Sequence, residues 1–358
     1  MQLSLRPQFQ SGSARCRAPV EGGTIEAMQC SVRVLLVAGI ATLALAEGAA
    51  AHPGSGIVVD ASGNVYFVVW GTNAIMRLDR DGRTTTFVSD ERLRLPHHLV
   101  LGKDGAIYAA SDYDGRIWRA GPDGSLREHF NSNRVARPEA GRAEVQVGSF
   151  GDPFTIDSMG NIYALASGNA SAIIRITPDG KVTPVATTAR FGALHFASMA
   201  WGADGALYLS DANRVWRIVA DSATPIVPRG VPLSQAAGLA VDGEGNIYVA
   251  DYGADRVVRF NRAGSVNTPS AIARLRVRRA TGVTVAGGDV YVLGSPPGGV
   301  VVWRVRGDEA KRLYSRRSSQ VYLRWALPVL LVSLVVLMVW NRVRRGQRNG
   351  GALAGGIR

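Results

Sequence analysis

Residues 238–260 read GLAVDGEGNIYVADYGADRVVRF and contain the pattern that decides the fold. An apolar segment, a turn rich in Asp and Gly, and a second apolar segment with one tyrosine follow one another. A third segment then places arginine between apolar residues. Aspartate and glycine tolerate the backbone angles of tight hairpins, and alternation of polar and apolar residues is typical of a half-exposed strand. The stretch therefore predicts three antiparallel strands joined by hairpins.

The same unit occurs six times between residues 56 and 315. Its tyrosines follow one another at intervals of 42, 55, 45, 40 and 43 residues, a period that suits a four-stranded propeller blade. We therefore predict an all-β, six-bladed β-propeller of four-stranded antiparallel blades over residues 52–315, with an open solenoid as the alternative. The repeated tyrosines are Tyr66, Tyr108, Tyr163, Tyr208, Tyr248 and Tyr291, and the repeated third-strand arginines are Arg77, Arg119, Arg175, Arg217, Arg259 and Arg304.

Two further features of the repeat indicate where its segments lie in the propeller. A nearly continuous apolar triplet precedes the first turn of each unit, as expected for an innermost strand buried on both faces. The longest interval contains an insertion at residues 131–151, which we expect to lie on one face of the propeller. The arginines are expected to form a solvated edge paired with turn aspartates.

The segments Gly238–Asp242, Gly245–Asp251 and Arg256–Phe260 resemble the NHL repeat. The unit is also similar to that of the six-bladed gluconolactonases and strictosidine-synthase-like proteins. This resemblance covers about 260 residues and implies the propeller fold. It does not select a function, since propellers of this kind include lyases, lactonases and binding scaffolds.

Residues 28–51 have the features of a signal peptide. Arg33 precedes an apolar stretch, and small residues at 49–51 form a cleavage site before His52. Residues 1–27 are polar and unpatterned, and are expected to be a leader or a non-native extension, with Met28 as the true start. An uncleaved N-terminal anchor is the alternative.

Residues 325–341 predict a single transmembrane helix, with Trp325 and Trp340 at the two interfaces. The basic tail at 342–358 is then cytoplasmic by the positive-inside rule, and 316–324 form a juxtamembrane linker. We therefore expect a single-pass protein of the cell membrane, with its propeller on the extracytoplasmic side. A buried core helix is the alternative for this segment.

The net charge of +13 does not indicate a nucleic-acid partner. Residues 52–315 contain 29 basic and 25 acidic residues, so that most of the excess lies in the tail. Both cysteines, Cys16 and Cys30, precede the predicted cleavage site, which excludes disulfides and thiol nucleophiles from the propeller. We expect a monomer whose partner is the membrane.

The candidate binding residues lie where innermost strands begin and where the second and third strands are joined. Both places open on the same face of a propeller. His97 and His98 are singled out because this position carries a channel zinc ligand in the amidating lyases that the chain resembles; its counterparts here are Ser55, Asp152, Ala197, Ala237 and Thr281. The candidates are His97, His98, Asp152, His195, Asp112, Asp211 and Asp251.

The candidates leave three functions open. We predict a membrane-anchored binding or scaffold module for a protein, peptide or glycan, without catalysis and without a cofactor. The alternatives are an amidating-lyase-like metalloenzyme or a metal-dependent lactonase, with zinc or calcium held by His97, Asp152 and His195. A lactonase of the family would carry a glutamate at the first innermost strand, where residues 52–56 contain none. The strand-end aspartates Asp112, Asp211 and Asp251 also have a structural interpretation, as acceptors for backbone N–H groups of nearby loops.

Overall fold

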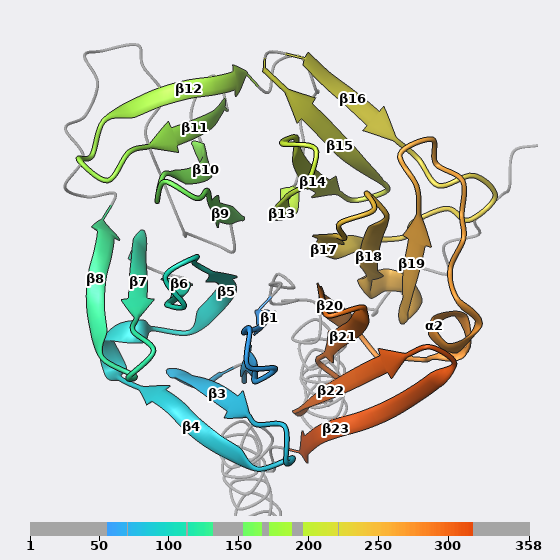
Figure 1. Ribbon diagram of the computed structural model, residues 1–358, viewed down its shortest axis with the longest axis horizontal. Coiled ribbons are helices and arrows are strands. Elements are labelled where there is room, and N and C mark those ends of the chain that lie inside the picture. Colours follow the sequence, from blue (N-terminus) through green and yellow to red (C-terminus); the bar gives the residue numbers. More distant parts are fainter. Residues whose placement is uncertain are drawn as a thin grey trace, which may run out of the picture. The chain divides into compact units, whose positions relative to one another are not determined.

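The computed structural model describes residues 56–69, 71–111, 114–131, 153–166, 172–187, 196–220 and 222–317. These residues form six antiparallel sheets, each made of consecutive strands. The sheets stand as the blades of a closed ring (Figure 1). The prediction of a six-bladed propeller is confirmed, and the open solenoid is excluded.

The first strand of each sheet lies nearest the axis of the ring. Blade 1 contains β1 (Ile57–Val59), β2 (Val65–Val68), β3 (Ala74–Leu78) and β4 (Thr84–Ser89), and blade 2 contains β5 (Pro96–Leu101), β6 (Ile107–Ser111), β7 (Arg116–Ala120) and β8 (Leu126–Asn131). Blade 3 contains β9 (Phe154–Ile156), β10 (Ile162–Ala166), β11 (Ala172–Ile176) and β12 (Val182–Thr187). Blade 4 contains β13 (Phe196–Trp201), β14 (Leu207–Asp211), β15 (Arg214–Val219) and β16 (Ser222–Ile226). Blade 5 contains β17 (Ala236–Val241), β18 (Ile247–Asp251) and β19 (Arg256–Phe260), and blade 6 contains β20 (Ala280–Ala286), β21 (Asp289–Gly294), β22 (Gly299–Arg306) and β23 (Glu309–Arg317).

The predicted apolar triplets form the innermost strands, and they are buried as their composition requires. Every residue of β1 and β2 is buried, because both faces of these inner strands are covered by neighbouring blades. The core is accordingly divided among the interfaces between blades rather than gathered at one centre. This division is what a ring of radially packed sheets produces.

Blade 5 differs from the predicted four strands. Its sheet has three strands, and the chain after β19 forms a short helix, α2 (Ser270–Arg274), in place of a full fourth strand. Thr268 satisfies the open edge of β19: its Oγ1 accepts from the backbone N–H of Arg259 at 2.8 Å and donates to the Arg259 carbonyl at 3.1 Å. Pro269, which has no N–H for a ladder, precedes the helix.

The ring closes between blade 6 and blade 1 without a shared strand, since each of these sheets is built from its own consecutive strands. Side-chain packing holds this junction, which we call the seam. Phe67 of blade 1 and Tyr314 of blade 6 have ring centroids 4.9 Å apart, and Val302 packs into the same core cluster as β1 and β2. Burial of apolar side chains stabilises the seam, and no backbone hydrogen bond joins blades 1 and 6 among the described residues.

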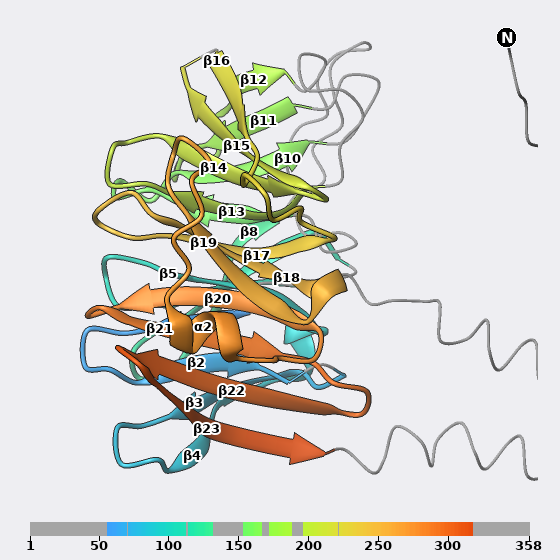
Figure 2. The same cartoon turned by 90° about the vertical axis from the view of Figure 1, so that its right-hand side faces the viewer.

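The ring has two faces, seen edge-on in Figure 2. We call the face at which the innermost strands begin the mouth face; it also carries the hairpins between second and third strands. The opposite face, the turn face, carries the turns between first and second strands and those between third and fourth strands. β23 ends at the mouth face (Figure 2).

Several predicted segments lie outside the described residues: the leader and signal peptide (1–51), the membrane span (325–341), the tail (342–358) and nearly all of the insertion at 131–151. Within the described ranges no helix has the length and apolar character that crossing a membrane requires. β23 continues to Arg317, two residues beyond the boundary predicted at Ser315.

Candidate functional site

A β-bulge marks the start of the innermost strand in blades 2, 4, 5 and 6. In β17, Ala236 pairs with Asp251 and Gly238 pairs with Ala250, so that Ala237 has no partner across the ladder. A residue placed this way is free to turn its side chain out of the sheet. The bulge positions in these four blades are His97, Ala197, Ala237 and Thr281.

His97 and His98 both lie in the bulge of β5 and are both buried, with exposed fractions of 6% and 2%. His98 corresponds to Gly56, Ser198, Gly238 and Gly282 of other blades. At Gly238 a Cβ would lie 2.7 Å from the Cα of Gly282 in the next blade, which shows how closely innermost strands approach at this position. His98 therefore occupies a place between blades where small residues are otherwise used.

Asp251 is fully buried and binds the loop that leads into its own blade. Its Oδ1 accepts from the backbone N–H groups of Ser234 and Gln235, each at 2.9 Å, and its Oδ2 accepts from Arg256 Nε at 3.0 Å. Arg256 also donates to the carbonyl of Pro232 at 2.6 Å. These bonds match the structural interpretation of the strand-end aspartates.

Asp211 is also buried, but its contacts are longer and lie within its own blade. Trp216 Nε1 donates to its Oδ2 at 3.5 Å, and Arg214 Nε lies 3.9 Å from the same oxygen. The register shows that the counterpart of Asp211 and Asp251 in blade 2 is Ser111, which pairs with Pro96. Asp112, the residue chosen from the sequence, stands one place further and lies outside the described residues.

The described part of the mouth does not form a site for a cation. Zinc requires three or four ligands from His, Cys or carboxylates, and calcium takes six to eight oxygen ligands. The described bulge positions offer one imidazole, one hydroxyl and two methyl groups. No group of three His, Cys, Asp or Glu side chains with ligand spacing occurs among the residues that the structure describes. Asp152 and His195, the other two predicted ligands, lie outside that part of the chain, so their metal role stays a prediction.

The turn face carries a polar cluster that the sequence only partly revealed. In every blade the repeated tyrosine lies directly opposite the repeated arginine, as Tyr208 does opposite Arg217. In five blades the tyrosine hydroxyl also donates to an aspartate of the turn between first and second strands. The O···O distances are 3.2 Å for Tyr66 and Asp60, 3.4 Å for Tyr108 and Asp104, 3.3 Å for Tyr163 and Asp157, 3.2 Å for Tyr208 and Asp204, and 3.2 Å for Tyr248 and Asp242.

The predicted pairing of arginines with turn aspartates is confirmed for Arg119 with Asp104 at 2.6 Å and for Arg217 with Asp204 at 2.7 Å. Burial raises the pKa of all six tyrosines, that of Tyr248 to about 12, so that each keeps its proton at neutral pH. The strict recurrence of both residue types was the signal in the sequence. Their contact required the strand register.

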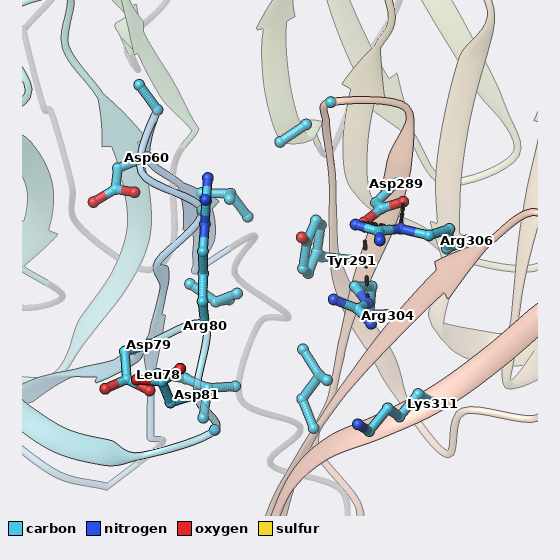
Figure 3. A pocket seen from close by; sticks show the side chains of 18 of the residues that line it. Asp60, Leu78, Asp79, Arg80, Asp81, Asp289, Tyr291, Arg304, Arg306 and Lys311 are labelled. Atoms are coloured by element: carbon cyan, nitrogen blue, oxygen red, sulfur yellow. Dashed lines mark hydrogen bonds and ion pairs between the residues drawn. The ribbon is translucent and has the colours of Figure 1, made fainter.

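A cavity of about 740 Å³ opens on the turn face at the seam. Its first wall comes from blade 1 and includes Asp60, Asp79 and Arg80, while blade 6 supplies the second wall with Tyr291 and Arg304 (Figure 3). Sequence reasoning did not find this cavity, because it requires the first and last repeats to meet.

The chain matches the model of a known protein family. Residues 100–293, from β5 to β21, match the family described as the SMP-30/gluconolactonase/LRE-like region. The match covers more than half of the chain. No protein with a curated description matches the sequence.

Solved structures similar to this chain are also propellers. A gluconolactonase from Xanthomonas campestris is 13% identical, with 73% of this chain and 87% of that chain covered at a TM-score of 0.51. Virginiamycin B lyase from Staphylococcus aureus is 18% identical, with 74% and 85% covered at a TM-score of 0.46. At these identities the likeness to the gluconolactonase shows the fold alone.

Proposed function

Because the chain belongs to the SMP-30/gluconolactonase/LRE-like family, we propose that it is a hydrolase that opens a small cyclic ester at the mouth face of the propeller. The observation that carries the proposal is the placement of His97. Among the described bulge positions it is the one with an ionisable side chain, and its counterparts Ala197 and Ala237 are chemically inert. An imidazole at a bulge position, where two other described blades have alanine, is suited to general base catalysis.

The reaction that fits these residues is the addition of water to a lactone. His97 accepts a proton from the attacking water, whose oxygen bonds to the carbonyl carbon. The ring C–O bond then breaks, and the departing oxygen takes the proton back from the imidazolium. The product is a hydroxy acid, and His97 returns to its neutral form.

A divalent cation is expected for a gluconolactonase, where it would polarise the lactone carbonyl. The described bulge positions do not fit such a group, since three of the four offer no carboxylate, amide or imidazole. We therefore assign no step to a metal.

The test is hydrolysis of a panel of γ- and δ-lactones by the purified full-length chain, followed by acid release at constant pH. Each assay is run with a chelator, with added calcium and with added zinc. We expect kcat/KM to fall by about 10² to 10⁴ in His97→Ala, the range typical of a lost general base. His129→Phe, a change on β8 at the outer edge of blade 2, is the control and should leave the rate unchanged. Equal rates in His97→Ala and the unmodified chain would refute the role of His97.

A non-catalytic binding module for a protein, peptide or glycan is the second candidate. It is favoured by the alanines at two bulge positions and by Asp251, whose oxygens already accept bonds from Ser234, Gln235 and Arg256. This candidate predicts no turnover of any lactone. It also predicts that zinc and calcium stay at background in the unmodified chain and in the double variant His97→Ala, Asp152→Ala, as measured by elemental analysis after desalting.

We also propose that the propeller is held at the membrane by residues 325–341, with the propeller on the extracytoplasmic side. Since β23 ends at the mouth face, a short linker would bring that face toward the bilayer. Extraction of membranes at alkaline pH tests the anchor. The full chain should stay with the membrane fraction, whereas a chain ending at Arg317 should be released. Release of the full chain under these conditions would contradict the anchor.

A further inference from the structure

On the turn face the propeller surrounds its own aspartate carboxylates with hydrogen-bond donors. Asp204 has the most complete set of such partners. The Asp204 Oδ2 accepts from Tyr208 OH at 3.2 Å and from Arg217 Nη2 at 2.7 Å. Arg262 of blade 5 reaches across the interface, with Nη1 3.5 Å from the same oxygen. Burial works to raise the pKa of Asp204, but hydrogen bonds from Arg217 and Ala206 and the charge of Arg262 hold it below its ordinary value. One tyrosine and two arginines thus stabilise a carboxylate anion.

Blade 6 has the tyrosine and the arginine but lacks the turn that carries this carboxylate. Its first and second strands are joined by Gly287 and Gly288 alone, with Ala286 paired directly to Asp289. In blade 4 the corresponding turn runs from Gly202 to Gly205 and includes Asp204. The shorter hairpin leaves the space above Tyr291 and Arg304 unfilled by the chain. That space is part of the seam cavity (Figure 3).

Asp289 does not replace the missing turn carboxylate. It is buried on β21 and binds Arg306 through both oxygens, at 2.7 to 3.0 Å. Its distance to Arg304 Nε is 4.0 Å, compared with 3.0 Å between Asp204 and Arg217 Nε in blade 4. Arg304 is therefore held beside Asp289 while one side of its guanidinium faces the cavity (Figure 3).

Arg80 of blade 1 corresponds to Arg262. Each is the second residue of its turn after a third strand, and each lies over the glycine of the neighbouring turn, where a Cβ at Gly63 would come within 2.5 Å of Arg80 Nε. Arg262 forms an ion pair with Asp204 of the preceding blade. Arg80 faces blade 6, and among the described residues no carboxylate lies within ion-pair distance of it. A carboxylate placed above Tyr291 would meet the same three groups that surround Asp204.

The remaining lining suits an anion with a short apolar body. The cavity contains five cationic side chains, Arg80, Arg304, Arg306, Lys311 and Arg312, and four carboxylates, Asp60, Asp79, Asp81 and Asp289. Val59, Val65 and Leu78 provide buried apolar surface beneath them. The volume lies in the range of cavities that hold small organic ligands, roughly 300 to 1,000 Å³.

We propose that the seam cavity binds the carboxylate of a small organic acid, held by Tyr291, Arg304 and Arg80 in the position that Asp204 occupies in blade 4. The site lies on the face opposite the mouth and does not depend on the proposed hydrolysis. Charge-assisted hydrogen bonds from two guanidinium groups and a hydroxyl supply the affinity, and the requirement for an anion supplies the selectivity.

The test uses hexanoate as the probe and hexanamide as its neutral counterpart, with binding to the full chain followed by ligand-observed NMR. We expect saturable binding of hexanoate, with hexanamide at least about tenfold weaker, since one hydrogen bond to a charged group is worth about that factor. Tyr291→Phe should weaken hexanoate about tenfold while keeping the ring that packs in the core. Tyr208→Phe, the same change where the chain supplies its own aspartate, is the matched control and should not alter binding.

A second variant fills the site from within the chain. Replacing Gly287-Gly288 by the sequence of residues 203–205, Ala-Asp-Gly, gives the hairpin the length of the blade 4 turn, restores the turn aspartate and should abolish hexanoate binding with the fold retained by circular dichroism. Equal binding of acid and amide, or unchanged binding in Tyr291→Phe, would overturn the proposal. Binding of a peptide with a free C-terminal carboxylate, but not of hexanoate, would overturn the assignment to a small acid.

Discussion

Asp251 and Arg256 form an ion pair on the mouth face, with 3.0 Å between the Asp251 Oδ2 and the Arg256 Nε and with the carboxylate fully buried. The same carboxylate fixes the backbone at Ser234 and Gln235. The pair therefore joins the hairpin of blade 5 to the loop that starts its innermost strand. These bonds hold the mouth in shape, as the structural interpretation of the strand-end aspartates expects.

Asp251→Asn should lower the free energy of unfolding by about 3 kcal/mol, because it removes the charge of a fully buried carboxylate that pairs with the partly buried Arg256. Urea denaturation measures the change. Asp211→Asn is the control and should cost clearly less, since the side-chain contacts of Asp211 with Trp216 and Arg214 are longer, at 3.5 and 3.9 Å. A larger loss in Asp211→Asn than in Asp251→Asn would contradict this ranking.

Gly238→Ala tests how closely innermost strands approach. A Cβ there would lie 2.7 Å from Gly282 Cα and 2.8 Å from the Thr281 carbonyl oxygen, both backbone atoms that cannot rotate away. We expect a loss of about 1 to 3 kcal/mol of stability, measured by thermal unfolding. Gly243→Ala, where no atom lies within 4 Å, should change stability by less than about 1 kcal/mol. Similar effects at both positions would refute the close approach.

Thr268→Val tests the open edge of blade 5. The substitution keeps the shape of the side chain but removes the oxygen that serves both the N–H and the C=O of Arg259. The Arg259 carbonyl still accepts from the backbone N–H of Asn267 at 3.1 Å, so a loss of about 1 to 3 kcal/mol is expected from the unsatisfied N–H of Arg259. Thr86→Val, on an exposed position of β4, is the control and should be nearly neutral. Hydrogen exchange at the Arg259 amide should also accelerate in Thr268→Val, and unchanged exchange would contradict the assignment.

His129 should make stability depend on pH. Burial, together with the charges of Arg127 and Arg119, holds the pKa of His129 below its ordinary value of 6.5. The folded imidazole therefore binds a proton more weakly than the unfolded one, so that stability is full above about pH 6.5 and falls as pH decreases below it. His129→Phe keeps the edge-to-face contact with Tyr108, at 4.8 Å between ring centroids, and removes the titration. The difference in unfolding free energy between pH 7 and pH 5 should be smaller in the variant; an equal difference would contradict the prediction.

The repeat could be predicted because its signals are local. Turn residues such as Gly245 and Asp242, the apolar triplet at 239–241 and the alternation around Arg259 each describe a short segment whose conformation depends on its own composition. Six copies of one strand pattern leave few arrangements other than a closed ring. The sequence therefore determined the number of blades, the order of strands and the identity of the innermost strand.

The tertiary structure decided what depends on residues distant in the chain. The register makes Ser111, not Asp112, the counterpart of Asp251, and the spacing from the repeated tyrosine agrees, since Ser111 and Asp251 each stand three residues after it. Thr268 and α2 replaced the fourth strand of blade 5 because a side chain satisfied the edge of β19. The cavity above Tyr291 exists only because blades 1 and 6 come together at the seam. Arg80 and Arg304 line it from opposite walls and are more than two hundred residues apart in the chain, so no local pattern could predict it.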